Sequence, residues 1–194
     1  MKKGIAVTRK IAITALLTAL GLIVFIIENQ FPPMFIPGAR MGLANVFSFA
    51  ALIMFSPAEA FLTVCLRTAL GAIFAGNVSA LMYSFTGGIV SMAVSSVLMY
   101  AVFPRVSVIA VSICSAVAHN ITQNTVFVVL TGTANMFVYL PYLMLLGIVS
   151  GATVGGIITL IFKKVPLSLF ERATGIKTRA DKNASDYINK ENLS

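Results

Sequence analysis

The sequence predicts an all-α integral membrane protein with six transmembrane helices and with both termini in the cytoplasm. Three observations predict this fold class. The mean hydropathy is +0.95, and 58% of the residues are hydrophobic while only 10% are charged, which leaves too little polar surface for a soluble chain of 194 residues. The apolar residues form runs near the ~20 residues that a bilayer core requires. Basic residues gather at the two ends of the chain.

Six apolar segments follow one another along the chain. Prolines at 37, 57 and 104 mark the borders of several of them. Basic residues precede the first segment, as in a signal peptide, but it lacks a small-x-small cleavage site and more apolar runs follow, so we interpret it as a retained helix. The predicted spans are 10–27, 38–55, 58–76, 79–103, 107–130 and 138–162.

The charge distribution orients the chain. We divide it into a basic cytoplasmic N-terminus (1–9), a six-helix transmembrane domain (10–162) and a basic polar cytoplasmic tail (163–194). The net charge of +8 describes these flanks, so we expect membrane lipids and no nucleic acid as partners. We expect a multi-pass protein of the bacterial cytoplasmic membrane. The outer loop at 28–40 is apolar and proline-rich, which suits a lid.

Arg67 lies inside an apolar segment, ten residues from Pro57 and nine from Gly76, and therefore near the bilayer midplane. An arginine at that depth costs at least ~2.5 kcal/mol on insertion scales, so its side chain is expected to face the bundle interior and to have a partner. Two interpretations stay open. Arg67 is either a structural arginine that binds helix carbonyls or a positive site for an anionic or carbonyl-bearing ligand.

The fifth segment contains the polar stretch HNITQN at 119–124, with the only histidine of the chain. Hydrocarbon offers such side chains no partners, so they need other helices or water. Interhelical hydrogen bonding is one interpretation, but so many amide and imidazole groups favour a water-filled cavity. At 3.6 residues per turn one helix face collects Ser112, Ser115, His119 and Gln123, flanked by Asn120 and Asn124.

Small residues recur at helical spacing in two other segments. The sixth segment has Gly147, Gly151 and Gly155 at every fourth position, which allows close approach of a neighbouring backbone. The fourth segment carries Ser84, Gly87 or Gly88, Ser91 and Ser95. We interpret both segments as packing surfaces, although the break at 86–88 in the fourth segment is also compatible with the border of a cavity.

The sequence lacks the motifs of common catalytic sites. It has no GxxxxGK[ST] loop for ATP, no Ser-His-acid set, no paired carboxylates and no aspartate-rich diphosphate-metal motif. Glu28 and Glu59 are the acids of the membrane portion and lie at predicted segment ends, which disfavours an ion relay. We therefore predict a protein that is not an enzyme and that has no catalytic residues, no metal site and no cofactor.

Four motifs are spaced along the membrane portion: RMGLANV (40–46), LRTALGAIFAG (66–76), YSFTGGIVSM (83–92) and AVAHNITQ (116–123). Together they resemble the Gx transporter family, which is also labelled heptaprenyl diphosphate synthase component I. The resemblance runs from about residue 10 to 162. The combination of four motifs is more specific than any one of them.

That family is similar to the substrate-binding S components of energy-coupling factor (ECF) transporters, which are six-helix membrane proteins. The resemblance implies an S-component-like bundle that captures a small molecule from outside and topples in the membrane to release it. It also implies a transmembrane coupling protein and two ATPase subunits as partners. In many S components a small-xxx-small motif on the first helix contacts the coupling protein, and Ala15 and Ala19 match this motif.

The resemblance also implies a ligand site, while the cargo stays open between a vitamin-like molecule, a quinone or isoprenoid precursor and a flavin-related molecule. Two alternatives to transport stay open as well. One is a membrane scaffold in quinone- or flavin-linked extracellular electron transfer, and the other is an accessory component of prenyl diphosphate synthesis for the menaquinone side chain. The residues at the ligand-site motif positions are Arg40, Asn45, Arg67, His119, Asn120 and Gln123.

Overall fold

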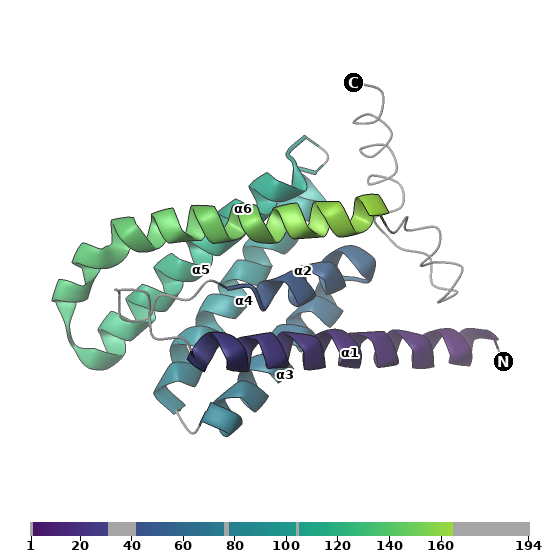
Figure 1. Ribbon diagram of the computed structural model, residues 1–194, viewed down its shortest axis with the longest axis horizontal. Helices are drawn as coiled ribbons and strands as arrows, with labels where there is room; N and C mark the ends of the chain where they lie inside the picture. Colours follow the sequence, from purple (N-terminus) through teal and green to yellow (C-terminus); the bar gives the residue numbers. More distant parts are fainter. Residues whose placement is uncertain (1, 31–41, 76–77, 104, 165–194) are drawn as a thin grey trace.

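The chain folds into a bundle of helices in the computed structural model, which describes residues 2–30, 42–75, 78–103 and 105–164. The first helix of the bundle and the last are the longest, and the last helix ends at the side of the bundle where the first begins (Figure 1). The elements of these described ranges are α1 (Lys2–Gln30), α2 (Asn45–Met54), α3 (Pro57–Ala75), α4 (Val78–Ala101), α5 (Val108–Thr131), the 3₁₀-helix η1 (Ala134–Tyr139) and α6 (Leu140–Lys164).

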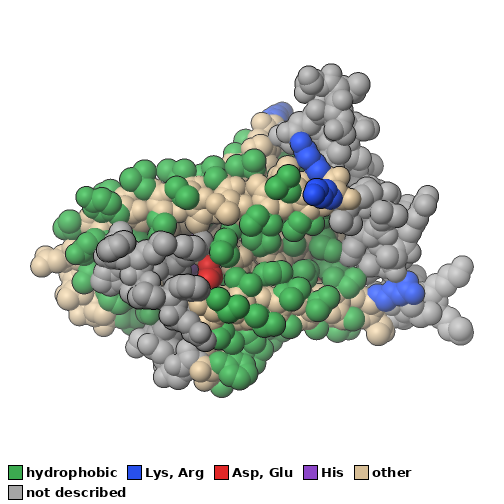
Figure 2. All heavy atoms as spheres, viewed as in Figure 1, with side chains coloured by type: hydrophobic (Ala, Val, Ile, Leu, Met, Phe, Trp, Pro, Cys, Tyr) green, Lys and Arg blue, Asp and Glu red, His purple; other side chains and the backbone are tan. Residues whose placement is uncertain are grey.

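The outer surface of the bundle is apolar. Large hydrophobic side chains such as Ile73 and Val129 are each 75% exposed, and Figure 2 shows hydrophobic side chains along the flanks of the described helices. Within the described ranges, five helical segments are long and apolar enough to cross a membrane, with η1 and α6 counted as one. The predicted all-α, multi-pass membrane architecture agrees with this structure.

The second predicted span is wrong as a single membrane-crossing helix. Of the range 38–55, the described part is helical only over Asn45–Met54, which is about 15 Å long against a hydrocarbon core of about 30 Å. Gly42 has a positive φ of 67°, a conformation that glycine adopts without strain and that interrupts a helix. The count of six spanning helices is therefore not confirmed.

Helix α2 is an interior element. It contacts α1, α3, α4 and α6, and six of its ten residues are buried. It ends at Met54 with Phe55 as its C-cap residue, and Ser56 directly precedes Pro57, where α3 begins. Because α2 is enclosed by helices on several sides, its first residues lie inside the bundle rather than at the end of a long span.

Polar contacts hold α1 near both of its ends. Glu28 Oε1 accepts a hydrogen bond of 2.7 Å from the backbone N–H of Leu43, and Lys10 forms an ion pair with Glu59 beside the α2–α3 corner. Residues 10 and 28 are about 27 Å apart along a helix with a rise of 1.5 Å per residue. The chain from Leu43 to Glu59 therefore returns along α1 from one end to the other.

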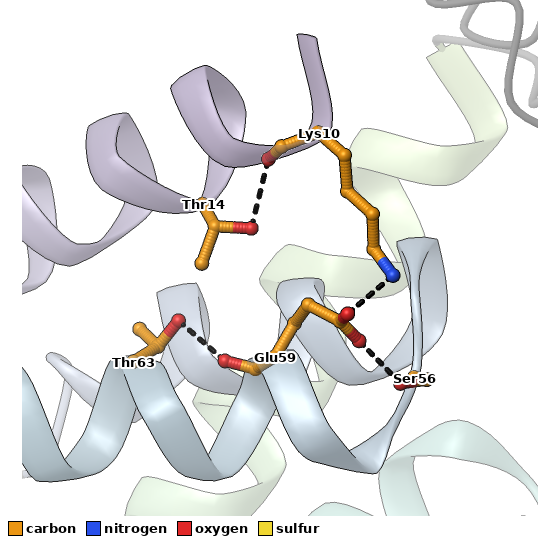
Figure 3. Close-up of polar contacts among 5 residues, drawn as sticks. All are labelled: Lys10, Thr14, Ser56, Glu59 and Thr63. Carbon is orange, nitrogen blue, oxygen red and sulfur yellow. Dashed lines mark hydrogen bonds and ion pairs between the residues drawn. The ribbon is translucent and has the colours of Figure 1, made fainter. Parts of the chain in front are cut away.

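The ion pair at the α2–α3 corner belongs to a small polar cluster (Figure 3). The Ser56 hydroxyl donates to the Glu59 carboxylate that also binds Lys10. Thr14 Oγ1 donates to the Lys10 carbonyl over 3.0 Å and Thr63 Oγ1 to the Glu59 carbonyl over 2.9 Å. The cluster fixes α1 against the start of α3, where the negative carboxylate also suits a helix N-terminus.

The predicted glycine surface of α6 is confirmed. A Cβ atom at Gly151 would lie 2.6 Å from Ile113 Cα, and one at Gly155 would lie 2.7 Å from Ile109 Cα. Both neighbours are backbone atoms of α5, so a side chain at either position would force the two helices apart. The contact also includes Gly147, where a Cβ would lie 3.1 Å from Val117 Cα.

Candidate functional site

The polar side of α5 faces the bundle interior, as its helical spacing predicted. All six polar residues of the predicted stripe are buried, with exposed fractions of 8% or less. A membrane bundle places polar side chains inside because lipid cannot hydrogen-bond them. The buried set comprises Ser112, Ser115, His119, Asn120, Gln123 and Asn124.

Arg67 faces the interior and has a partner, as predicted. Its side chain is 3% exposed, and Nη2 donates a hydrogen bond of 2.9 Å to Asn45 Oδ1 on α2. Gly21 on α1 leaves room for the arginine, because a Cβ there would lie 3.2 Å from Arg67 Cδ. The guanidinium carbon lies 6.0 Å from the centre of the Phe25 ring, a distance at which the ring face attracts a cation. Helices α1 and α2 thus hold the arginine, which extends from α3.

Asn45 connects the arginine to the first turn of α2. Since its Oδ1 accepts from Arg67, its Nδ2 group points elsewhere with two protons to donate. That nitrogen lies beside Gly42, where an added Cβ would be 3.2 Å away. The positive end of the α2 dipole lies at the same place. Asn45, from the sequence motif at 40–46, thus supplies a fixed hydrogen-bond donor next to the buried positive charge of Arg67.

His119 packs against α4. A Cβ at Gly87 would lie 3.2 Å from His119 Cε1 and 3.3 Å from its Nδ1, so the glycine allows the imidazole to lie directly on the α4 backbone. The imidazole is 8% exposed. The predicted break at 86–88 is not a break in the helix, because α4 continues through it. Its role is close packing against the histidine.

Asn120 and Asn124 face a different neighbour. Asn120 Nδ2 donates a hydrogen bond of 2.8 Å to the backbone carbonyl of Leu143 on α6. Asn124 Nδ2 makes a longer contact of 3.4 Å with the carbonyl of Met136 in η1. The amide groups therefore join α5 to the η1–α6 segment. Gln123 is 4% exposed on the same helix.

A small cavity with both polar and apolar lining residues lies among α2, α4, α5 and α6. Its volume is about 20 Å³, and about 10–15 Å³ is enough for one water molecule. The serine hydroxyls of the wall are nine-tenths or more buried, and Asn45 brings the wall within one hydrogen bond of Arg67. The lining comprises Gly42, Asn45, Phe49, Ser91, Met92, Ser95, Ser112, Ser115, Ala116, Ser150 and Val154.

Three of these serines form a hydrogen-bonded group between α4 and α5. Ser95 Oγ donates to Ser115 Oγ over 2.7 Å, and Ser115 Oγ donates to the Ser91 carbonyl over 3.0 Å. Ser91 Oγ lies 2.7 Å from Ser115 Oγ. Because Ser115 has already used its single proton, Ser91 must be the donor in that contact.

The structure thus brings Asn45 and Arg67 together beside the cavity, and it places His119 and Asn120 in contacts with α4 and α6. Arg40 and most of the predicted lid at 28–40 lie outside the described residues. The sequence-based interpretation treated the serines of α4 as packing residues and overlooked Ser150. Serines one turn apart, such as Ser91 and Ser95, were the available signal for a hydroxyl-lined wall.

Ala15 and Ala19, the predicted partner-contact residues, both lie on the exposed side of α1. The opposite side of this helix holds Thr14, Thr18 and Gly21, all of which are buried. The small-residue motif therefore faces the surroundings of the bundle.

Five long apolar helices of the described ranges, with an apolar exterior and buried polar side chains, define a multi-pass membrane protein. The chain matches the family model for heptaprenyl diphosphate synthase component I over residues 17–161. It belongs to this family, as its motifs had indicated. No curated protein and no solved structure matches the chain.

Proposed function

We propose that this protein is the substrate-binding subunit of an energy-coupling factor-type importer and captures a small molecule from outside the cell. One observation carries the proposal. A buried arginine and its partner Asn45 stand at the edge of a hydroxyl-lined cavity inside a membrane bundle, and buried ionisable groups at such depth are characteristic of substrate sites. ATP hydrolysis is assigned to partner subunits.

In the proposed site, Arg67 meets an anionic or carbonyl group of the cargo and Asn45 holds the arginine in place. His119, Asn120 and Gln123 of α5 do not line the cavity and are proposed to meet the cargo after the surrounding helices separate. Arg40, which lies outside the described residues, is proposed as a second positive group for the cargo. Pockets for small molecules measure roughly 300–1,000 Å³, whereas this cavity has about 20 Å³. Cargo binding therefore requires the helices around the cavity to separate. The Asn120 contact with Leu143 is one that such a movement would stretch.

The proposed topology has six crossings and cytoplasmic termini. In this topology the α2 region is proposed as an additional, partly non-helical crossing. The return of the chain from Leu43 to Glu59 along α1 supports this proposal. Lys163 and Lys164 lie in the last turn of α6, and the described Lys and Arg side chains visible in Figure 2 lie toward the end where α1 begins. This distribution agrees with the positive-inside rule.

Affinity capture tests the proposed assembly. The tagged full chain, extracted in mild detergent, is expected to carry a transmembrane coupling protein and two ATPase subunits. Replacing Ala15 and Ala19 together by leucine should abolish this association, because larger side chains prevent close helix approach. Ala69→Leu is the matched control, since Ala69 is an exposed alanine on α3. Retention of the partners by the double variant would exclude this α1 surface.

The family description favours one other function. A component of heptaprenyl diphosphate synthase would act as a membrane accessory subunit, with catalytic acids supplied by a partner. Capture of a prenyl-transferring protein instead of ATPases would select this function. Capture of a reductase would select the scaffold in quinone- or flavin-linked electron transfer.

A further inference from the structure

Three serine hydroxyls of the cavity wall already use their protons in hydrogen bonds within the protein. Each serine hydroxyl has one proton and two acceptor sites. Ser91 and Ser95 both give their protons to Ser115, and Ser150 Oγ gives its proton to the Gly147 carbonyl over 3.3 Å. These three hydroxyls therefore offer only acceptor sites to the cavity.

Two other residues of the wall, Asn45 and Ser112, have protons that they can donate. Asn45 Nδ2 has two protons and lies beside Gly42, which lines the cavity. Its orientation is set by Arg67, which occupies the carbonyl side of the amide. Ser112 adds a hydroxyl that can either donate or accept. The wall thus presents acceptors from α4 and α6 and a donor from α2.

This pattern selects the chemistry of the occupant. Among the described residues, the cavity lining includes no carboxylate, so a bare cation would lie there without charge compensation. An anion would face the acceptor oxygens of three serines. A neutral group that both donates and accepts hydrogen bonds satisfies both parts of the wall, and the volume of about 20 Å³ suits a single oxygen-centred group of this kind.

We propose that the cavity is a binding site for one hydroxyl-sized group, which is a water molecule in the cargo-free protein and a hydroxyl group of the cargo in the loaded protein. The binding of water is inferred from the cavity alone. The binding of a cargo hydroxyl rests on the proposed transport function. It predicts a preference for cargo with a hydroxyl group, because such a group replaces the water without loss of hydrogen bonds.

Magnetisation transfer from water protons to ¹³C-labelled serines tests the site in the full chain reconstituted in lipid vesicles. Transfer to Ser91, Ser95 and Ser115 is expected in the wild type. Ala116→Val places a larger side chain in the cavity wall and should abolish this transfer. Ala118→Val is the matched control on the same helix, outside the lining, and should retain it. Ser112→Thr, which adds one methyl group, replaces Ala116→Val if that variant does not fold.

Mass spectrometry of small molecules released from the same preparation separates the two occupants. Transfer in a preparation that releases no compound identifies water, and it does so whether or not the protein transports anything. Absence of transfer together with a released compound that carries a hydroxyl identifies the cargo group. Absence of transfer without such a compound overturns the proposal, as does equal transfer in wild type and Ala116→Val.

Discussion

Arg67 on α3 and Asn45 on α2, 22 residues apart in sequence, meet inside the bundle through a hydrogen bond of 2.9 Å from Nη2 to Oδ1. This contact orients both side chains. The arginine is held below Gly21 and Phe25 of α1, and the amide turns its N–H groups toward the cavity side. The pair therefore joins the buried charge to the hydroxyl-lined wall.

Asn45→Leu should destabilise the protein. Leucine has a similar volume but no acceptor, so a buried guanidinium N–H loses its partner, at a cost of about 1–3 kcal/mol in the free energy of unfolding. The expected reading is a lower Tm in detergent. Asn45→Asp is the control, because it keeps an acceptor oxygen and should retain or raise the Tm. Equal destabilisation by both variants would contradict the role assigned to this hydrogen bond.

The Lys10–Glu59 pair should show measurable coupling in a double-mutant cycle. The two side chains are 33% and 19% exposed, so the coupling is expected near the range of about 0.2–1 kcal/mol found for exposed pairs. Lys10→Ala, Glu59→Ala and the double variant are compared by thermal unfolding in detergent. High salt should reduce the coupling. Strictly additive effects of the two substitutions would show that the pair does not hold α1 to α3.

Gly151→Ala should weaken the packing of α5 against α6. The added methyl would lie 2.6 Å from a backbone atom of α5, and overpacking of this kind costs about 1–3 kcal/mol. Gly156→Ala is the matched control on the same helix, because an added Cβ there would have no atom within 4 Å apart from its chain neighbours and the backbone of its own helix. The control should be neutral or slightly stabilising, since alanine favours helices. Comparable Tm values for the two variants would argue against the close contact.

Asn120→Ala should lower stability through the loss of its bond to Leu143. The backbone carbonyl is left without the amide donor seen at 2.8 Å, which corresponds to about 0.5–1.5 kcal/mol for an ordinary hydrogen bond. Thr125→Ala is the comparison variant, because Thr125 is exposed and bonds only within its own helix. Thermal unfolding of both variants in detergent gives the difference. A smaller effect for Asn120→Ala than for Thr125→Ala would contradict a role in joining α5 to α6.

Helical spacing was sufficient to predict which side of α5 is buried, because lipid leaves polar side chains no alternative to the interior. The same physics placed Arg67 inside the bundle. It could not identify Asn45 as the partner, since that contact depends on how α2 and α3 fold back on each other. The α4 serines became a cavity wall only where four helices converge.

The second span shows the limit of hydropathy. The range 38–55 is apolar enough for a membrane helix, but apolar composition does not distinguish a lipid-facing span from a short interior helix. The positive φ of Gly42 and the enclosure of α2 by four other helices are tertiary features. Pro57 did signal the start of α3, yet the ion pair of Glu59 with Lys10 required the structure.

Binding of a small molecule at Arg67 is tested by mass spectrometry of the compounds released from the purified full chain, compared between wild type and Arg67→Ala. Arg105→Ala is the matched control, because Arg105 is an exposed arginine between α4 and α5. If Arg67 binds the cargo, a compound is released by wild type and by Arg105→Ala and is lost from folded Arg67→Ala. Equal release from all three proteins, or no compound from wild type, would contradict the proposed binding site.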